Sequence, residues 1–586
     1  FLKNVDEFKI LRLTPFAYWV SDEIITSLAK VGTLDPDAAI VRCGLSTGNN
    51  DRFVRVLWEI PNGLLLKRWF PLVMTGTSQP WYSPLLVVVD WYKKGDYLSA
   101  FPGSTLRSTE LYLRPGISWT RRAVRFIPYA IPSGCIPSAS RYMAFPKRGH
   151  EYSILGIAGS NMAGSYLRFF GEKFSFPNYL VDSVKSLPWL DLDQKLSDQL
   201  EAFVKQQIKS RRDAYQNYEP FQEFLLPKMI TMALGRQVHD LSFDYNHLLN
   251  EELDHLIAKA FGLSAKDLTE LERDMLEAIA ARNQSVIESE DDDQESDPLG
   301  EISENDEYHN LLSYVIGNIR FATGEKPASE LPDPFAPLPA CPPGMLQNAQ
   351  GLPATPQDVP TDYPLCISWG GVLVDDEGHS ENLQARVREA LHVIWREDGE
   401  AIESEACQIL GVHSLREYFQ KPTLFFAEHL KRYSKSRRAA PIYWPFSTPS
   451  GSYTLWLYYH RLNDQTLYTC VNDFVDPKLK QVSEEAARLR LKKGRSAAEE
   501  KELERLTDFE RELKDFREEL LRVAKFWKPN LNDGVEITAA PLWKLFQHKP
   551  WQKRLKETWQ KLEAGEYDWS NMAYNIWPER VREKCK

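Results

Sequence analysis

The stretch "VRCGLSTGNNDRFVRVLWEIP", residues 41–61, decides the fold that we predict for the first part of this chain. Two apolar runs, 41–45 and 53–58, stand on either side of the small polar residues 46–52. Strand-like runs separated by Gly and Asn are typical of two strands joined by a tight turn. We therefore expect a turn whose backbone amides are free, and the question is whether it meets a phosphate, a base or only water.

The residues around this stretch predict an α/β domain followed by a helical segment. Residues 1–190 are rich in aromatic and β-branched residues broken by Pro and Gly, which indicates short strands, and a short helix is expected after Ser21. Residues 191–285 carry apolar residues at helical spacing and are predicted to form a helical spacer. Within it, Gly262 should end one helix and Ser264 should begin the next.

The composition changes twice between residues 286 and 362. Residues 288–307, "ESEDDDQESDPLGEISENDE", are a run of like charge that we expect to be solvated. A short helical piece follows, and then a Pro-rich segment that is typical of an extended linker. We therefore predict an acidic and Pro-rich linker over 286–362, which separates two halves of the chain.

The second half is predicted to hold an α/β domain, 363–480, and a helical hairpin with C-terminal helices, 481–586. Gly494 should close one helix of the hairpin, and Ser496 with Glu499 forms a capping box that opens the next. That second helix has apolar residues at every seventh position: Leu506, Leu513, Leu520 and Trp527. Such a seam fits a helix pair within one chain or a dimer. The predicted fold class is thus mixed α/β and multidomain.

The composition is that of an ordinary globular protein. With 586 residues, 43% of them hydrophobic and 26% charged, the chain is too long for one core, and about three or four domains are expected. No apolar run approaches the roughly 20 residues that cross a bilayer, so we expect no membrane contact. The chain begins without Met or a signal pattern, and we expect it to be part of a longer protein. Seven dispersed cysteines indicate reduced thiols and no metal site, so we expect a cytoplasmic protein.

The charge is unevenly divided along the chain. The whole sequence carries −11, but residues 1–187 hold 22 Lys and Arg against 14 Asp and Glu, a balance of +8. The remaining residues therefore carry −19. A mildly basic first third is compatible with a polyanionic partner there.

No usual catalytic pattern is found in the sequence. Residues 44–48 are not followed by the lysine of a nucleotide P-loop, and no GxSxG elbow is found. The tetrapeptide [DNS]PP[YFW], with which aminomethyltransferases hold a flipped adenine, is absent too, since the Pro pair at 342–343 reads "CPPG". We therefore name no catalytic residue and predict that this segment does no chemistry by itself.

Several segments resemble a known family, and they do so in the family's order. "VRCGLSTGNNDRFVRVLWEI", "RPGISWT" and "YSILGIAGSNMAGSYLRFF…SVKSLPWLDL" are similar to the target-recognition region of TaqI-like and type IIG adenine-N6 DNA methyltransferases. "LNEELDHLIAKAFGLSAKDLTELE" is similar to the helical unit that follows there. "LREYFQKPTLFFAEHLKRYSKSRRAAPIYWPFSTPSGSYTLWLYYHRL", "NDGVEITAAPLW" and "YDWSNMAYNIWPERVREKC" resemble the C-terminal region of PglX, the methyltransferase of BREX phage-defence systems. The methyltransferase of DISARM defence systems is the close competitor.

The resemblance implies a parent enzyme that is a site-specific, adenine-specific DNA methyltransferase. Its S-adenosylmethionine domain, with an NPPY-type motif, would precede residue 1, so no cofactor is expected in this chain. The partners implied are double-stranded DNA, that N-terminal methyltransferase domain and other phage-defence proteins. The sequence departs from the family at Arg121 and Arg122, which follow Trp119 and Thr120 where a polar residue is usual.

The first candidate DNA contacts lie in the turn. Backbone amides and short side chains are expected to approach a phosphate at Gly44, Thr47, Gly48 and Asn49. Asn50 or Arg52 would then reach a base edge, because Asn pairs with adenine and Arg with guanine in the major groove. The alternative is a Gly-Asn turn that only joins two strands.

The other candidates are basic or aromatic residues farther along the chain. Those predicted to contact DNA are Trp119, Arg121, Arg122, Lys147 and Arg148. The alternative is a core Trp beside a solvated basic edge. The segment 431–438, "KRYSKSRR", could clamp DNA from the far side or be a solvated face. The aromatic residues expected in the core are Tyr443, Trp444, Trp456, Tyr458 and Tyr459.

Two function classes remain open from the sequence. The chain is either a DNA-recognition and clamp module of a methyltransferase, or a scaffold whose acidic second half binds protein partners. The position of the basic residues of 1–187 distinguishes them. A single concave basic surface facing the second half favours the clamp, and scattered basic residues favour the scaffold.

Overall fold

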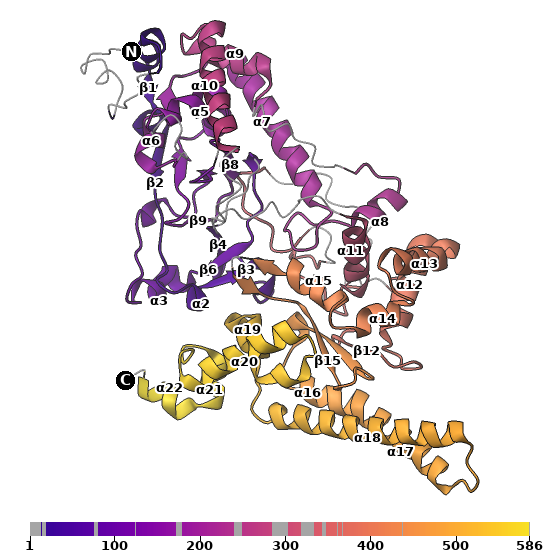
Figure 1. The fold of residues 1–586 in the computed structure, drawn as a ribbon. Coiled ribbons are helices and arrows are strands. Elements are labelled where there is room, and N and C mark those ends of the chain that lie inside the picture. The colour runs from indigo at the N-terminus through magenta and orange to yellow at the C-terminus, as the bar shows by residue number, and fades with distance from the viewer. Residues whose placement is uncertain are drawn as a thin grey trace.

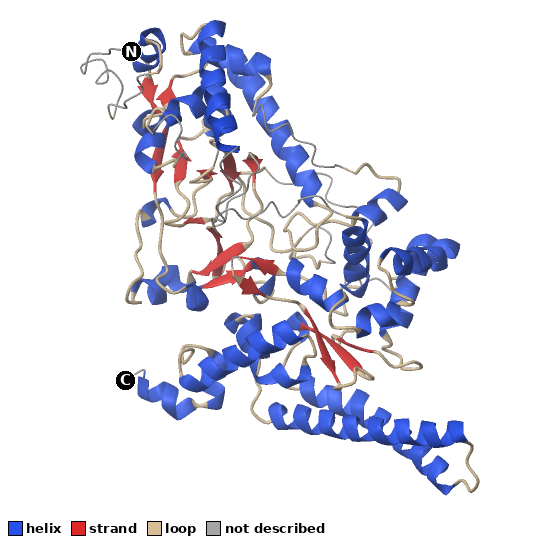
Figure 2. Cartoon of the chain, in the orientation of Figure 1, coloured by secondary structure: helices blue, strands red, loops and turns tan. Residues whose placement is uncertain are grey.

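The computed structural model has an N-terminal half, drawn at the top of Figure 1, and a C-terminal half below it. The residues that the structure describes are 13, 19–74, 80–123, 125–170, 178–238, 249–283, 303–317, 333–342, 347–359, 361–365, 367–435 and 437–584. No helix among them is long and apolar enough to span a membrane. Figure 2 shows several small sheets surrounded by helices, so the mixed α/β, multidomain fold class is confirmed.

The first sheet has five strands in the order β2, β10, β7, β8, β5. Their bounds are β2 (Ala39–Arg42), β10 (Met143–Pro146), β7 (Gly116–Trp119), β8 (Pro128–Ile131) and β5 (Trp81–Tyr82). All neighbours are antiparallel except β5 and β8. Among the helices that share the core on one face of this sheet are α4 (Glu151–Ala158), α5 (Asn161–Arg168) and α7 (Gln194–Tyr215). The other face is buried in a separate cluster, in which Tyr129, Ile131, Met143 and Phe145 pack with Val73 and Leu85.

The second sheet has four strands in the order β3, β6, β4, β9. Their bounds are β3 (Val54–Val56), β6 (Val87–Asp90), β4 (Trp69–Val73) and β9 (Ile136–Pro137). The two apolar runs of 41–61 therefore enter different sheets, β2 in the first and β3 in the second. The predicted tight turn between paired strands is wrong, because residues 43–53 cross from one sheet to the other.

The predicted helical spacer contributes to the core of the N-terminal half. Helix α7 places Leu200, Val204 and Ile208 in the cluster that also holds the strand residues of the first sheet. Helices α9 (Glu251–Ala260) and α10 (Ala265–Asn283) follow. Gly262 has a φ of +78°, and the Ser264 hydroxyl accepts the Asp267 amide at 3.2 Å, as the sequence predicted. The remaining short elements of this half are α1 (Asp22–Ala29), β1 (Gly32–Thr33), α2 (Asn50–Phe53), α3 (Asp96–Ser99), α6 (Val181–Lys185), β11 (Pro188–Trp189) and α8 (Lys228–Ala233).

The predicted linker contains a helix that belongs to a core. Most of the acidic run 288–307 lies outside the described residues, but α11 (Glu304–Gly317) is described. Leu311 and Leu312 are both fully buried in the large cluster of the C-terminal half. The short helical piece that the sequence predicted within 286–362 is therefore present, and its leucines pack in the core of the C-terminal half.

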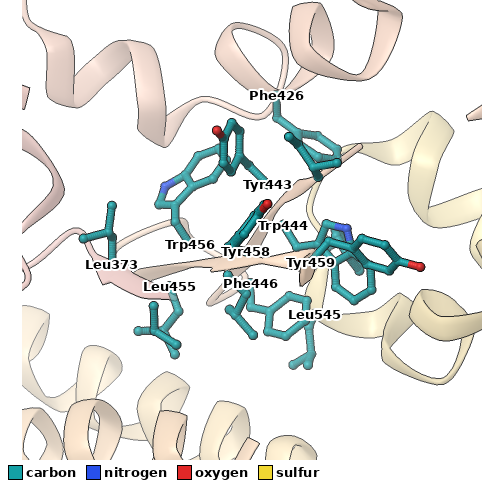
Figure 3. Packing of buried hydrophobic residues seen from close by; sticks show 14 of the residues in the cluster. Leu373, Phe426, Tyr443, Trp444, Phe446, Leu455, Trp456, Tyr458, Tyr459 and Leu545 are labelled. Carbon is teal, nitrogen blue, oxygen red and sulfur yellow. The ribbon is translucent and has the colours of Figure 1, made fainter. Parts of the chain in front are cut away.

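The C-terminal half is built on a small antiparallel sheet in the order β12, β16, β15. The strands are β12 (Val372–Val374), β16 (Thr454–Tyr458) and β15 (Tyr443–Ser447). In Figure 3, Tyr443 and Trp456 point to one side of the sheet and Phe446 and Leu455 to the other. The core placement predicted for the aromatic residues of this segment is confirmed, because each is at most 8% exposed.

Helices complete the C-terminal half. They are α12 (Leu383–Trp395), α13 (Gly399–Ile409), α14 (Leu415–Gln420), α15 (Phe425–Arg432), α16 (Thr466–Thr469), α17 (Asp476–Leu491), α18 (Ala497–Ala524), α19 (Val535–Ala539), α20 (Lys549–Ala564), α21 (Asn571–Ile576) and α22 (Pro578–Lys584). A two-residue hairpin, β13 (Ser434–Lys435) and β14 (Arg438–Ala439), follows α15. Helices α17 and α18 pack on each other within the chain, and Leu506, Leu513 and Leu520 are buried. The capping box of Ser496 and Glu499 is present.

The two halves meet along β3 through a buried arginine. Arg55 is 1% exposed. Its Nε and Nη2 donate to the Asn532 carbonyl oxygen at 3.2 and 3.1 Å. Its guanidinium lies 5.3 Å from the ring centre of Trp69 and 5.6 Å from that of Trp569. Burial lowers the pKa of Arg55 to about 10, so the group keeps its charge at neutral pH.

Glu59 crosses the same seam and balances that charge. It is 1% exposed, and its two carboxylate oxygens accept the amides of Val56 at 2.9 Å and Val535 at 3.0 Å. Arg438 Nη1 lies 3.6 Å from Glu59 Oε1. The Tyr459 hydroxyl donates to the Glu59 carbonyl oxygen at 3.0 Å. Such buried polar contacts define one relative placement of the two halves, because an unpaired partner would be costly.

Candidate nucleic-acid interface

The loop 44–52 is fixed at its beginning by strand-like pairing. The Gly44 amide donates to the Ser138 carbonyl oxygen at 3.2 Å and the Leu45 amide to that of Pro137 at 3.0 Å. Ser46 and Thr105 exchange two hydrogen bonds of 2.8 Å. A Cβ on Gly44 would lie 1.9 Å from the Pro137 carbonyl oxygen, so only glycine fits. These amides are used inside the protein, and Gly44 does not offer its amide to a phosphate.

The second half of the loop is shaped by its own side chains. Thr47 is 5% exposed, and its hydroxyl donates to Asn50 Oδ1 at 2.5 Å. Asn49 caps α2, because its Oδ1 accepts the Arg52 amide at 3.0 Å. Gly48 takes a φ of +66°, which favours glycine, and it is exposed together with Asn50. Of the predicted loop residues, Gly48 and Asn50 therefore stand at the solvent-facing tip.

Arg52 lies against two aromatic rings at this tip. Its guanidinium carbon is 5.1 Å from the ring centre of Phe53 and 5.4 Å from that of Phe101. The side chain is half-buried. Stacking on rings restricts the rotamers of a long arginine and leaves less entropy to lose on binding. Arg52 therefore keeps its place as a candidate for base readout.

Trp119 and the two arginines that follow it lie in different environments. Trp119 is 1% exposed, and its indole N–H donates to the Tyr179 carbonyl oxygen at 3.0 Å. Direct contact between this ring and DNA is excluded by burial, and the core alternative holds. Arg121 Nε donates to Asn178 Oδ1 at 3.1 Å, whereas Arg122 is exposed.

Lys147 and Arg148 lie at the opposite end of the first sheet from the loop. Along β10, Met143 pairs with Arg42 and Pro146 with Ala39. Lys147 therefore follows the end of β10 that lies beside the start of β2, and its Nζ donates to the Asp37 carbonyl oxygen at 2.6 Å. Lys147 and Arg148 are both exposed, but they do not belong to the same surface as the loop.

Strand pairing brings basic residues to the loop's end of the sheet that the sequence did not single out. These residues are Arg42, Arg107 and Arg141. Together with Arg121 and Arg122, which the sequence did predict, we call them the sheet-end cluster. Arg42 pairs with Met143 and bonds to Asp35 at 2.9 Å. Arg107 Nη1 lies 3.9 Å from Cys43 Sγ. No local signal reveals this cluster, because its members are far apart in the sequence.

The basic segment 431–438 is divided between the interior and a groove. Burial lowers the pKa of Arg432, which faces the interior, whereas Arg437 is exposed. A groove of about 540 Å³ lies between the loop and α20. Its basic lining residues are Arg437, Arg438, Lys553, Arg554 and Lys561, and its acidic ones are Asp51, Asp533, Glu536 and Glu557. The charges of this groove nearly balance, because its five cations face four carboxylates. Arg554, for example, pairs with Glu536 at 2.6 Å.

The basic residues of the first third therefore do not form a single surface. The sheet-end cluster and the loop occupy one end of the first sheet, and Lys147 and Arg148 the other. Arg55 does face the C-terminal half, but it is buried there.

Comparison with known proteins gives this arrangement a context. No protein-family model matches the chain. The chain is similar to an adenine-specific methyltransferase. "Adenine-specific methyltransferase BrxX" of Escherichia coli O9:H4 (strain HS) is 23% identical over 510 residues, which are 81% of this chain and 39% of that protein. The chain thus spans about two fifths of the length of the curated relative that it matches.

Proposed function

We propose that this chain is the DNA-recognising part of a SAM-dependent adenine-N6 DNA methyltransferase that acts in bacterial defence against phages. The observation that carries the proposal is the similarity to adenine-specific methyltransferase BrxX over 81% of the chain. The order of the sequence segments supports a PglX-like parent of a BREX system, with a DISARM methyltransferase as the nearest alternative. We expect the chain to act in the cytoplasm, with double-stranded DNA as its ligand.

Methyl transfer is assigned to another part of the parent protein. This sequence holds no [DNS]PP[YFW] tetrapeptide to grip a flipped adenine. No residue of this chain is therefore assigned to S-adenosylmethionine.

DNA contact is proposed at the tip of the loop and at the sheet-end cluster. The exposed tip at Gly48 and Asn50 offers backbone groups to a phosphate, and Asn50 and Arg52 supply side-chain donors for the acceptor atoms of adenine and guanine edges. The arginines of the sheet-end cluster supply charge for neighbouring phosphates. In this proposal the phosphate contacts fix the position of the protein on the duplex, and the loop selects the base sequence.

The scaffold remains a second candidate function, for one reason. The basic residues of 1–187 are divided between two ends of a sheet, and the remainder of the chain carries −19. A scaffold would bind other defence proteins through its acidic half and leave DNA reading to the rest of the parent.

Duplex-DNA binding across a salt series separates the two functions. The test compares the wild-type chain with the triple variant Arg52→Ala, Arg121→Ala, Arg122→Ala. A charge-matched control removes three exposed cations from the distant α17–α18 hairpin: Lys480→Ala, Arg488→Ala and Lys493→Ala. Each phosphate contact adds about 0.9 to the slope of log K against log salt, so loss of the phosphate contacts of Arg121 and Arg122 in the triple variant should lower the slope by about 2.

Each outcome decides between the candidates. A lower slope in the triple variant but not in the control supports DNA recognition at this surface. Equal slopes in both variants would show binding through net charge alone and contradict the assigned site. No binding by the wild-type chain at low salt would favour the scaffold.

A further inference from the structure

The C-terminal half contacts the loop 44–52 through carbonyl oxygens of the loop backbone. The Asp51 carbonyl oxygen accepts two hydrogen bonds, from Arg55 Nη1 at 2.8 Å and from Arg438 Nη2 at 3.0 Å. Arg438 Nη2 also lies 3.4 Å from the Asn50 carbonyl oxygen. Two guanidinium groups, one from each half of the chain, therefore converge on the helical turn that carries Asn50 and Arg52.

Helix α2 needs such support because it is only one turn long. It covers four residues, Asn50–Phe53, and a single turn is unstable without outside contacts. Phe53 anchors it on the inner side, where it is 2% exposed. On the outer side the Tyr567 hydroxyl donates to Asp51 Oδ2 at 3.4 Å. Contacts from both halves of the chain thus stabilise this helical turn.

Arg438 is itself held in place by both halves. It lies in β14, and its Nη1 is 3.6 Å from the buried carboxylate of Glu59. The next residue, Ala439, donates its amide to Glu536 at 3.2 Å, and the Ala440 carbonyl oxygen accepts the Trp58 indole N–H at 3.1 Å. The Arg438 side chain is 16% exposed, and its hydrogen bonds go to carbonyl oxygens of the loop.

We propose that Arg438 is a positioning residue that sets the orientation of the DNA-reading loop and so its sequence discrimination. This inference rests on the proposed function. Base-edge contacts require placement within about 0.5 Å, whereas phosphate contacts depend mainly on charge. Loss of Arg438 therefore lowers the preference for the target sequence more than it lowers general affinity for DNA.

The test uses the full chain in four forms: wild type, Arg438→Ala, Arg438→Lys and Arg488→Ala. Arg488→Ala is the control, since it removes the same charge from an exposed position on the distant helix α17. A random duplex pool first identifies the sequence that the wild type enriches. Affinity for that duplex and for a scrambled one is then measured across a salt series. Hydrogen exchange is followed at the amides of residues 52–54.

Arg438→Ala is expected to lower the ratio of specific to scrambled affinity about tenfold, the effect of losing a charged hydrogen bond. Its salt slope should change by less than about 1, because no phosphate contact is lost. The amides of residues 52–54 should exchange about tenfold faster. Arg438→Lys, which keeps the charge beside Glu59 but not the fork of donors, should fall between, and Arg488→Ala should match the wild type.

Failure of this inference is distinguishable from failure of the proposed function. If Arg438→Ala keeps both the affinity ratio and the exchange rates of the wild type, the positioning role is wrong and the proposed function stands. If the wild type enriches no sequence, both are overturned. Should Arg438→Ala fail to fold, Tyr567→Phe tests the same turn, with an expected two- to threefold loss of the ratio and no change of charge.

Discussion

Replacement of Gly44 by alanine tests how tightly the beginning of the loop is held. The added Cβ would lie 1.9 Å from the Pro137 carbonyl oxygen and 2.2 Å from its carbonyl carbon. Carbon atoms in contact settle about 3.5–4.0 Å apart, so the two backbone segments must move apart by more than about 1 Å. That displacement breaks the pairing that carries the chain from the first sheet into the loop.

The magnitude follows from the contacts that are lost. Three hydrogen bonds join the segments: Gly44 to Ser138 at 3.2 Å, Leu45 to Pro137 at 3.0 Å and Ala139 to Leu45 at 2.7 Å. Each contributes about 0.5–1.5 kcal/mol, and overpacking costs about 1–3 kcal/mol. The free energy of opening this pairing should fall by about 2.5–7.5 kcal/mol, which over most of that range is a hundredfold or more in the opening equilibrium.

Native-state hydrogen exchange measures that opening directly. The amides of Leu45 and Ala139 should exchange at least a hundredfold faster in Gly44→Ala than in the wild type. Gly370→Ala is the control, because no atom lies within 4 Å of the added Cβ and its φ needs no glycine. Exchange at Leu45 within threefold of the wild type would refute the close packing of this loop.

Three further predictions concern the seam, a buried carboxyl and the hairpin. Arg55→Ala should destabilise the contact between the halves by about 3–5 kcal/mol, because it leaves buried acceptors unpaired; a thermal scan with Arg55→Lys as the milder variant measures this. Burial raises the pKa of Asp254 to about 7, so its contribution to stability is full near pH 4, falls as the pH rises and is gone above pH 7. Asp254→Asn should flatten the melting temperature between pH 5 and 8, and an unchanged slope would contradict this origin. Leu513→Ala should cost about 2–5 kcal/mol in denaturant unfolding, whereas Leu491→Ala, at an 84% exposed position, should cost less than about 0.5 kcal/mol.

Local signals in the sequence were enough for the elements and for much of the core. Ser21, Gly262 and Ser496 marked helix ends that the structure has, because capping depends on residues within one turn. The seventh-position leucines indicated the hairpin, and the structure decided that its partner is α17 in the same chain. The burial of Trp119 could not be predicted in this way, since an aromatic residue close to two arginines is equally compatible with a surface or a core position.

The sequence by itself determined the mixed α/β class, the helix caps, the aromatic core of the C-terminal half and the resemblance to adenine-specific methyltransferases. Only the tertiary structure decided that β2 and β3 enter different sheets, that Gly44 is packed against Pro137, and that α11 is part of a core. It also gathered the sheet-end cluster and placed Arg438 behind the loop. The physical reason is range: caps and periodicity act within a few residues, whereas strand pairing and buried ion pairs join residues hundreds of positions apart.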